Sequence, residues 1–176
     1  MISRSASKRF LLAGGALVLT MVLLCFPMAS RAVGAPVSAK FLIVPGKSIG
    51  PLKIGMTRKQ AKQGMMSTFK VRARLDPVTE GLCWFSGNLC ATFLAGKDSL
   101  VTAAVKGDRR FMIQERVRIG SDTNDAVERL GQRLGRPGVI NTSDGAFVSW
   151  LGLQMTVTSL GSGKFVVSSL MVTPKR

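Results

Sequence analysis

The 176-residue chain contains no histidine and no tyrosine. The absence of histidine excludes Ser-His-Asp and Cys-His catalysis and histidine-ligated zinc, and the absence of tyrosine excludes a tyrosine acid or nucleophile. Three cysteines are too few for a zinc site built from four thiolates. The composition therefore excludes the commonest catalytic and metal-binding arrangements, and we expect no cofactor.

Acidic residues are scarce as well. The chain has nine Asp and Glu against 25 Lys and Arg, a formal net charge of +16. Apolar residues make up 46% of the chain, which is too apolar for an intrinsically disordered protein. The acids are scattered and form no carboxylate pair for general acid–base catalysis, and residues 122–125 lack the glycine and the closing glutamate of a calcium loop. We expect neither catalysis nor metal binding.

Residues 1–35 have the layout of a secretory signal peptide. Arg4, Lys8 and Arg9 precede an uncharged, mostly apolar stretch over residues 10–26, and small residues follow it. Cleavage near residue 35 leaves residues 36–176 as a single exported domain, periplasmic or secreted. The alternative is an uncleaved inner-membrane anchor facing outward, in which residues 10–26 contact the membrane, because this stretch has the minimum length of a membrane span.

Export decides how the cysteines are interpreted. Removal of the signal peptide removes Cys25 and leaves Cys83 and Cys90, which are seven residues apart. In an oxidising compartment such a pair favours a disulfide. The turn residues between them predict a hairpin tip with a cross-strand bridge. Two free buried thiols are the alternative.

Hydrophobic alternation predicts antiparallel strands on either side of two short helices. The clearest alternation covers residues 69–75, where Phe69, Val71, Ala73 and Leu75 face one side of a predicted strand and the intervening basic residues face the other. Further strands are predicted over residues 40–44, 49, 52–54, 91–94, 100–105, 139–140, 146–151 and 164–172.

Two segments of the chain repeat the same pattern. Thr57 with Gln60 forms a capping box that predicts a helix beginning near Arg58, and Asp122 is a good N-cap for a helix beginning near Thr123. The sequence LKIG at residues 52–55 aligns with VRIG at residues 117–120, an offset of 65 residues that also relates the two caps. We therefore expect an α+β fold of two sheet-plus-helix halves from an internal duplication, about 40–110 and 111–176, with antiparallel strands and two short helices.

The first repeat resembles a known family signature. IGPLKIGMTRKQAKQ, residues 49–63, is similar to the strand-Gly-Met-Thr-helix motif of exported bacterial domains with the fold of β-lactamase inhibitor protein and of the outer-membrane lipoprotein BamE (the SmpA/OmlA type). VRIGSDTNDAVERLGQRLG, residues 117–135, is similar to the second motif of tandem members. The resemblance covers residues 46–173 and implies an α+β fold and protein binding rather than catalysis. BamE is a lipoprotein, and a lipoprotein signal has a small residue just before its cysteine. This chain departs from that pattern because Leu24 precedes Cys25.

Basic residues dominate the start of the predicted mature chain. Residues 36–75 contain nine Lys and Arg and no acid, and such a one-sign field attracts anions. An ordinary solvated face is the alternative. Trp84 is either an exposed anchor for a partner or a core residue. The candidate anion- or partner-binding residues are Lys70, Arg72, Arg74, Arg116, Arg118 and Trp84.

These observations favour a non-catalytic exported binding protein of the bacterial cell envelope. The expected partner is an acidic protein, an anionic lipid or an envelope polyanion. Nucleic acid is not expected outside the cytoplasm, and the chain is poor in the aromatic residues that stack on bases. The rival interpretation is a periplasmic or secreted hydrolase that uses Ser or Asp without His.

Overall fold

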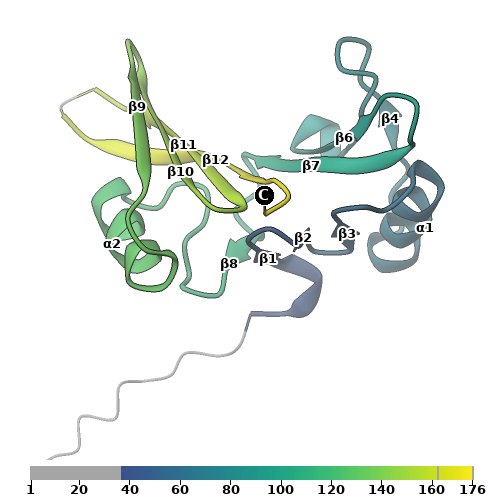
Figure 1. Ribbon diagram of the computed structural model, residues 1–176, viewed down its shortest axis with the longest axis horizontal. Coiled ribbons are helices and arrows are strands. Elements are labelled where there is room, and N and C mark those ends of the chain that lie inside the picture. Colours follow the sequence, from purple (N-terminus) through teal and green to yellow (C-terminus); the bar gives the residue numbers. More distant parts are fainter. Residues whose placement is uncertain (1–36, 162, 176) are drawn as a thin grey trace, which may run out of the picture. The chain divides into compact units, whose positions relative to one another are not determined.

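The computed structural model describes residues 37–161 and 163–175 (Figure 1). The predicted signal peptide, the alternative membrane anchor over residues 10–26 and Cys25 lie outside the described residues. Residues Pro36–Arg176 form one compact unit. Its helices and antiparallel strands confirm the predicted α+β class.

Eight strands form the larger sheet, and every neighbouring pair in it is antiparallel. From edge to edge the strands are β4 (Arg74–Leu75), β5 (Leu82–Trp84), β6 (Leu89–Leu94), β7 (Ser99–Lys106), β12 (Phe165–Val172), β11 (Leu153–Ser159), β10 (Gly145–Trp150) and β9 (Gly138–Thr142). Each half of the sheet is a four-stranded meander. The two meanders join through β7 and β12, where Val105 lies opposite Leu170.

A smaller sheet has four short strands in the order β3-β2-β1-β8. These are β1 (Leu42–Val44), β2 (Ser48–Ile49), β3 (Leu52–Lys53) and β8 (Met112–Ile113). β1 and β8 run parallel, whereas the other pairs are antiparallel. The 3-10 turn η1 (Ala39–Phe41) precedes β1, and η2 (Phe85–Gly87) follows β5. The pairing of β1 with β8 places the beginnings of the two halves side by side.

Each half contains one helix of 12 residues, and both helices begin where their caps predict. In α1 (Arg58–Phe69) the Thr57 hydroxyl accepts the Gln60 N–H at 3.2 Å, and the Gln60 side chain accepts the Thr57 N–H at 2.9 Å. This is a complete capping box. In α2 (Thr123–Leu134) the Asp122 carboxylate accepts the N–H groups of Asn124 and Asp125.

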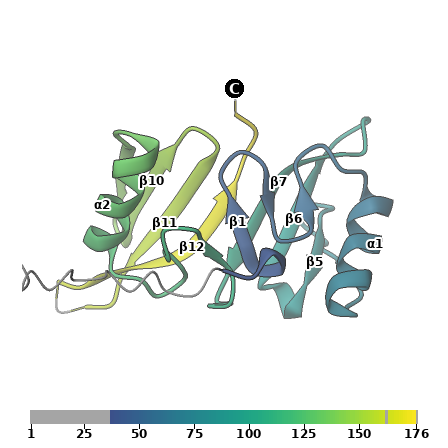
Figure 2. The same cartoon turned by 90° about the horizontal axis from the view of Figure 1, so that it is seen from below.

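One hydrophobic core connects the helices and both sheets. α1 is associated with the β4–β7 half and α2 with the β9–β12 half (Figures 1 and 2). Alternate residues of the long strands are buried, and the helices contribute Ala61, Met65, Ala126 and Leu130. Ala61 corresponds to Ala126, and Met65 to Leu130, each at an offset of 65 residues. The halves therefore repeat each other in packing as well as in element order. Their origin by duplication stays an inference from the sequence.

The predicted strand over residues 69–75 was wrong in extent. α1 continues through Phe69, and Lys70 ends it in the left-handed conformation with φ of 59°, so only Arg74–Leu75 pair in the sheet. The alternation still describes the packing, because Phe69, Val71 and Ala73 are partly buried against the core. Leu75 is the exception, since it is 67% exposed.

The final forty residues contain four strands rather than the three that were predicted. The missed strand is β11, which follows a turn at Gly152 with φ of 84°. Its buried residues Leu153, Met155 and Val157 alternate with half-buried ones. This period of two is the signal that identifies it as a strand. The second half therefore has four strands after its helix, as the first half does.

The Asp122 cap gives a direct test of the α2 boundary. Asp122→Ala should lower the free energy of unfolding by about 1 kcal/mol, because two N–H groups at the helix start lose their acceptor. Glu128→Ala, an exposed change in the same helix, should leave it within about 0.5 kcal/mol. Urea denaturation of both variants measures the difference. Equal stability of the two variants would contradict the cap.

Candidate functional site: an arginine pocket beside a disulfide hairpin

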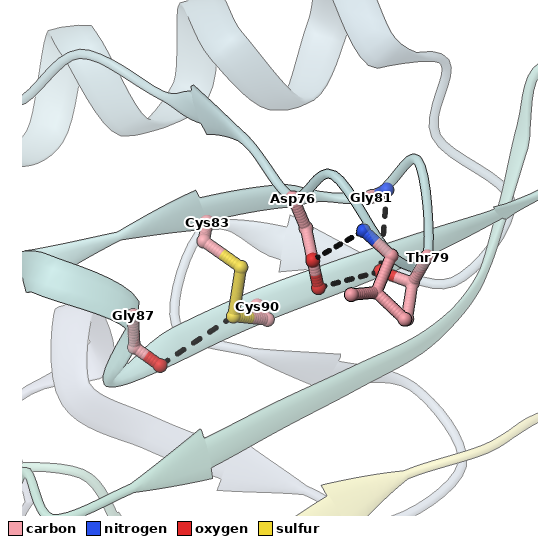
Figure 3. The surroundings of a disulfide bond; sticks show 7 residues. Asp76, Thr79, Gly81, Cys83, Gly87 and Cys90 are labelled. Carbon is pink, nitrogen blue, oxygen red and sulfur yellow. Dashed lines mark hydrogen bonds between the residues drawn. A yellow bond between two sulfur atoms is a disulfide. The ribbon is translucent and has the colours of Figure 1, made fainter.

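Cys83 and Cys90 form the predicted disulfide across β5 and β6, with sulfurs 2.08 Å apart (Figure 3). The two residues lie directly opposite each other in the ladder. The Cys90 sulfur is 3.4 Å from the Gly87 carbonyl oxygen, and this is a contact rather than a donated hydrogen bond because a disulfide sulfur carries no proton. The bridge fixes the base of the hairpin tip over residues 85–88.

The turn between β4 and β5 is held by its own side chains (Figure 3). The Asp76 carboxylate accepts the Thr79 hydroxyl at 2.7 Å and the Val78 N–H at 3.0 Å, and the Thr79 oxygen accepts the Gly81 N–H at 3.3 Å. These hydrogen bonds, that from Thr79 first, lower the pKa of Asp76. The turn therefore has a defined geometry immediately after Arg74.

A pocket of about 200 Å³ lies beside the disulfide, and two arginines line it. Arg74 is directly opposite Cys83 in the β4–β5 ladder, and Arg72 lies in the short connection between α1 and β4. The pocket is lined by Val71, Arg72, Arg74, Cys83, Trp84, Phe85 and Ser86. The structure thus brings Arg72, Arg74, Cys83 and Trp84 together from the predicted residues, while Lys70 is exposed at the end of α1.

Trp84 packs inward, so the exposed-anchor interpretation is wrong. Its side chain is 2% exposed, because successive strand residues face opposite sides of a sheet and Cys83 takes the other side. Among the described residues the Trp84 indole N–H has no hydrogen-bond partner. Its counterpart at the end of β10, Trp150, donates to the Gly135 carbonyl at 3.0 Å.

Arg116 and Arg118 lie elsewhere, in the loop between β8 and α2. Both are exposed. Arg118 forms an isolated bridge to Met112 of the smaller sheet, whereas Arg74 is at the edge of the larger one. Of the five basic candidates, Arg72 and Arg74 line the pocket beside the disulfide, and Lys70, Arg116 and Arg118 are not among its lining residues.

The basic candidates keep their charge uncompensated in the part of the chain that the structure describes. Four ion pairs occur there, and none includes Lys70, Arg72, Arg74, Arg116 or Arg118. The pairs are Arg58–Asp98, Arg110–Asp108, Arg129–Asp125 and Arg133–Glu115. The two arginines of the pocket are accordingly available to an anion.

Sequence reasoning missed a cluster of aromatic rings that supports the hairpin tip. Five pairs among Phe41, Phe69, Phe85 and Phe111 have ring centroids 5.3 to 6.2 Å apart, and several of these pairs are edge to face. Such pairs add stability beyond the area they bury. The four residues come from distant segments, so no periodicity in the sequence signals the cluster. It holds Phe85, and with it one wall of the pocket, against the core.

Arg110 covers this cluster and is itself held by a carboxylate. Its guanidinium lies 5.3 Å from the Phe41 ring centroid and 5.1 Å from that of Phe85. Asp108, whose side chain is 8% exposed, accepts from Arg110 Nε at 3.0 Å and from Nη2 at 2.7 Å. These hydrogen bonds lower the pKa of Asp108 and raise the pKa of Arg110. Arg110 is thus a structural cation.

Within the described residues no group of three or more His, Cys, Asp and Glu side chains is placed to hold a metal ion. The serine hydroxyls that make hydrogen bonds in this part of the chain contact backbone groups or threonine hydroxyls. None of these bonds joins a serine to a lysine or a carboxylate.

Comparisons with known proteins identify no relative. No protein-family model matches the chain, and neither does a curated protein or a solved structure. The resemblance to BamE-like domains therefore stays a prediction. No helix in residues 37–161 and 163–175 combines the length and the apolar character needed to cross a membrane.

The disulfide predicts a specific thiol count. The denatured, unreduced full chain should show one titratable thiol, that of Cys25, or none once the signal peptide is removed. Reduction should add two more. Thiol titration before and after reduction measures this, with a Cys83→Ser, Cys90→Ser double variant as control, in which reduction should add none. Three thiols in the unreduced chain would contradict the bridge.

The Asp108 carboxylate should make the free energy of unfolding depend on pH. Asp108→Asn should lower the free energy of unfolding at pH 7 by about 1–3 kcal/mol, because charge-assisted hydrogen bonds to Arg110 are lost. The folded pKa lies below the unfolded one, so this stabilisation is present above the unfolded pKa and disappears as pH falls through the folded pKa.

The difference between the Asp108→Asn variant and the native chain should therefore shrink below about pH 4. Urea unfolding from pH 3 to pH 7 measures it. Asp144→Asn, at an exposed loop position, is the matched control and should have little effect at any pH. A difference that stays constant with pH would show that the Asp108 charge does not stabilise the fold.

Proposed function

We propose that this chain is a non-catalytic exported binding protein of the bacterial cell envelope, and that it engages an anionic partner through the arginine pocket. One observation carries the proposal: Arg72 and Arg74, which form no ion pair among the described residues, line the same pocket. Uncompensated charges placed together repel each other, and an anion would remove that repulsion.

The framework of the pocket supports binding without rearrangement. The disulfide ties β5 to β6, the Asp76 turn fixes the residues after Arg74, and the phenylalanine cluster holds Phe85. Guanidinium groups bind carboxylates and phosphates in a two-pronged geometry. Because the backbone beside Arg74 and the Phe85 wall are already fixed, binding would have to order only the two arginine side chains.

Features of the sequence support the proposed compartment and class of partner. The predicted signal peptide and the disulfide both favour an oxidising, exported location, where nucleic acid is not expected. The resemblance to BamE-like and inhibitor-like domains favours an acidic protein surface as the partner. An anionic lipid or an envelope polyanion would also present carboxylate or phosphate groups to the two arginines. The binding experiment below therefore compares poly-glutamate with anionic vesicles.

Arg72→Glu should weaken binding to an anionic partner several-fold and reduce its dependence on salt, because one phosphate- or carboxylate-binding group is reversed. The fold should persist, since Val71 and Ala73 make the local packing. Binding is measured to poly-glutamate and to vesicles with and without anionic lipid, at 0.01 M and 0.1 M salt, where the Debye length falls from about 30 Å to about 10 Å.

Arg136→Glu is the matched control. Arg136 is exposed, belongs to the second half and forms no ion pair among the described residues. The Arg136→Glu substitution changes the net charge by the same amount as Arg72→Glu. Equal loss of binding in the two variants would mean that net charge alone attracts anions, and the pocket would not be the site.

A further inference from the structure

A larger groove lies in the second half, where the beginning of α2 meets β9, β10 and β11. Its volume is about 800 Å³, in the range of small-molecule sites. The apolar side chains that line it are Val127, Val139, Ala146, Val148, Val157 and Phe165. Two of these, Val139 and Phe165, remain 55% and 43% exposed. Only Asp122 and Lys164 among the lining residues are charged.

In the first half, an arginine covers the corresponding part of the sheet. α1 begins at Arg58 and α2 begins at Thr123. The Arg58 guanidinium lies 4.9 Å from the Phe93 ring centroid and forms an ion pair with Asp98 at 3.0 Å. The first position of α1 thus places a long side chain across the sheet, and the first position of α2 has a short one.

Strand register identifies what replaces the contacts of Arg58. Each half has one irregularity in the ladder between its third and fourth strands, after which pairing resumes at Phe93–Leu100 and at Val157–Val167. Phe93 therefore corresponds to Val157. Asp98, two residues before Leu100, corresponds to Phe165, two residues before Val167. The second half lacks the arginine, the ring below it and its counter-ion, and an open groove with apolar walls lies there.

Two charged side chains, Asp122 and Lys164, lie among the lining residues of the groove. Asp122 is engaged by the helix, since its Oδ1 accepts the N–H groups of Asn124 and Asp125. Lys164 forms no ion pair within the described residues. Its backbone is fixed in the β11–β12 turn, where its N–H donates to Gly161 and its carbonyl accepts from Leu160. The rim therefore presents one available cation next to an apolar wall.

We infer that this groove binds an anionic amphiphile, a small molecule with one carboxylate and an apolar chain such as a medium-chain fatty acid. The chain would lie against Val139, Val157 and Phe165, and the carboxylate would meet Lys164. The site is separate from the arginine pocket, because it belongs to the second half and shares no lining residue with it.

Thr123→Trp tests the site because it places a large uncharged side chain at the helix position from which Arg58 covers the first half. Arg58 shows that this helix position accepts a long side chain. Equilibrium dialysis of decanoate against the full chain, below its micelle concentration, should show binding at least tenfold weaker in Thr123→Trp. Thr123→Val, which is similar in size to threonine, should bind as the native chain does. Any decanoate bound at residues 10–26 or in the arginine pocket is common to all variants.

A second comparison tests the carboxylate. The native chain should bind decanoate several-fold more tightly than decanol, and Lys164→Gln should lower the affinity for decanoate to that for decanol while leaving decanol unchanged. Circular dichroism checks that the variants fold. Equal decanoate binding in Thr123→Trp and the native chain, or equal binding of decanol and decanoate by the native chain, would overturn the inference.

Discussion

The antiparallel pairing of β7 with β12 is the interaction on which the rest of the molecule depends. It turns two four-stranded meanders into one sheet of eight strands, with Val105 and Leu170 buried where they meet. A segment of the size of either half would have only a marginal core by itself. Joined at this seam, and again by the parallel pairing of β1 with β8, the halves share one core.

Local signals in the sequence were sufficient to predict where the two helices begin. Thr57 and Asp122 predicted both helix starts, because a cap acts on the N–H groups two and three residues away. The end of α1 was not predictable in this way. The alternation over residues 69–75 is real in the burial pattern, yet the helix continues into it, since residues that alternate in exposure do not have to pair in a sheet.

The lining of the arginine pocket was likewise only partly predictable, because it depends on how distant strands pair. Arg72 and Arg74 are exposed as the alternation required, but their position beside the hairpin tip depends on the pairing of Arg74 with Cys83. The burial of Trp84 could have been deduced, because a cross-strand disulfide through Cys83 on one face places its neighbour on the other. The phenylalanine cluster could not, since its members meet only after the chain has folded.

The two halves fix their corresponding hairpin tips, between β5 and β6 and between β10 and β11, by different means. In the second half, the tip at Gly152 is docked against the β1–β2 turn. The Gly46 N–H donates to the Gly152 carbonyl at 2.7 Å, and a Cβ at Gly152 would lie 2.6 Å from the Gly46 Cα. Only glycine permits that approach, and Gly152 is buried there, whereas Leu151 beside it is 61% exposed. The first-half tip is tied by Cys83–Cys90 instead. A covalent bridge fixes a hairpin without covering it, which leaves Ser86 and the two arginines open to solvent.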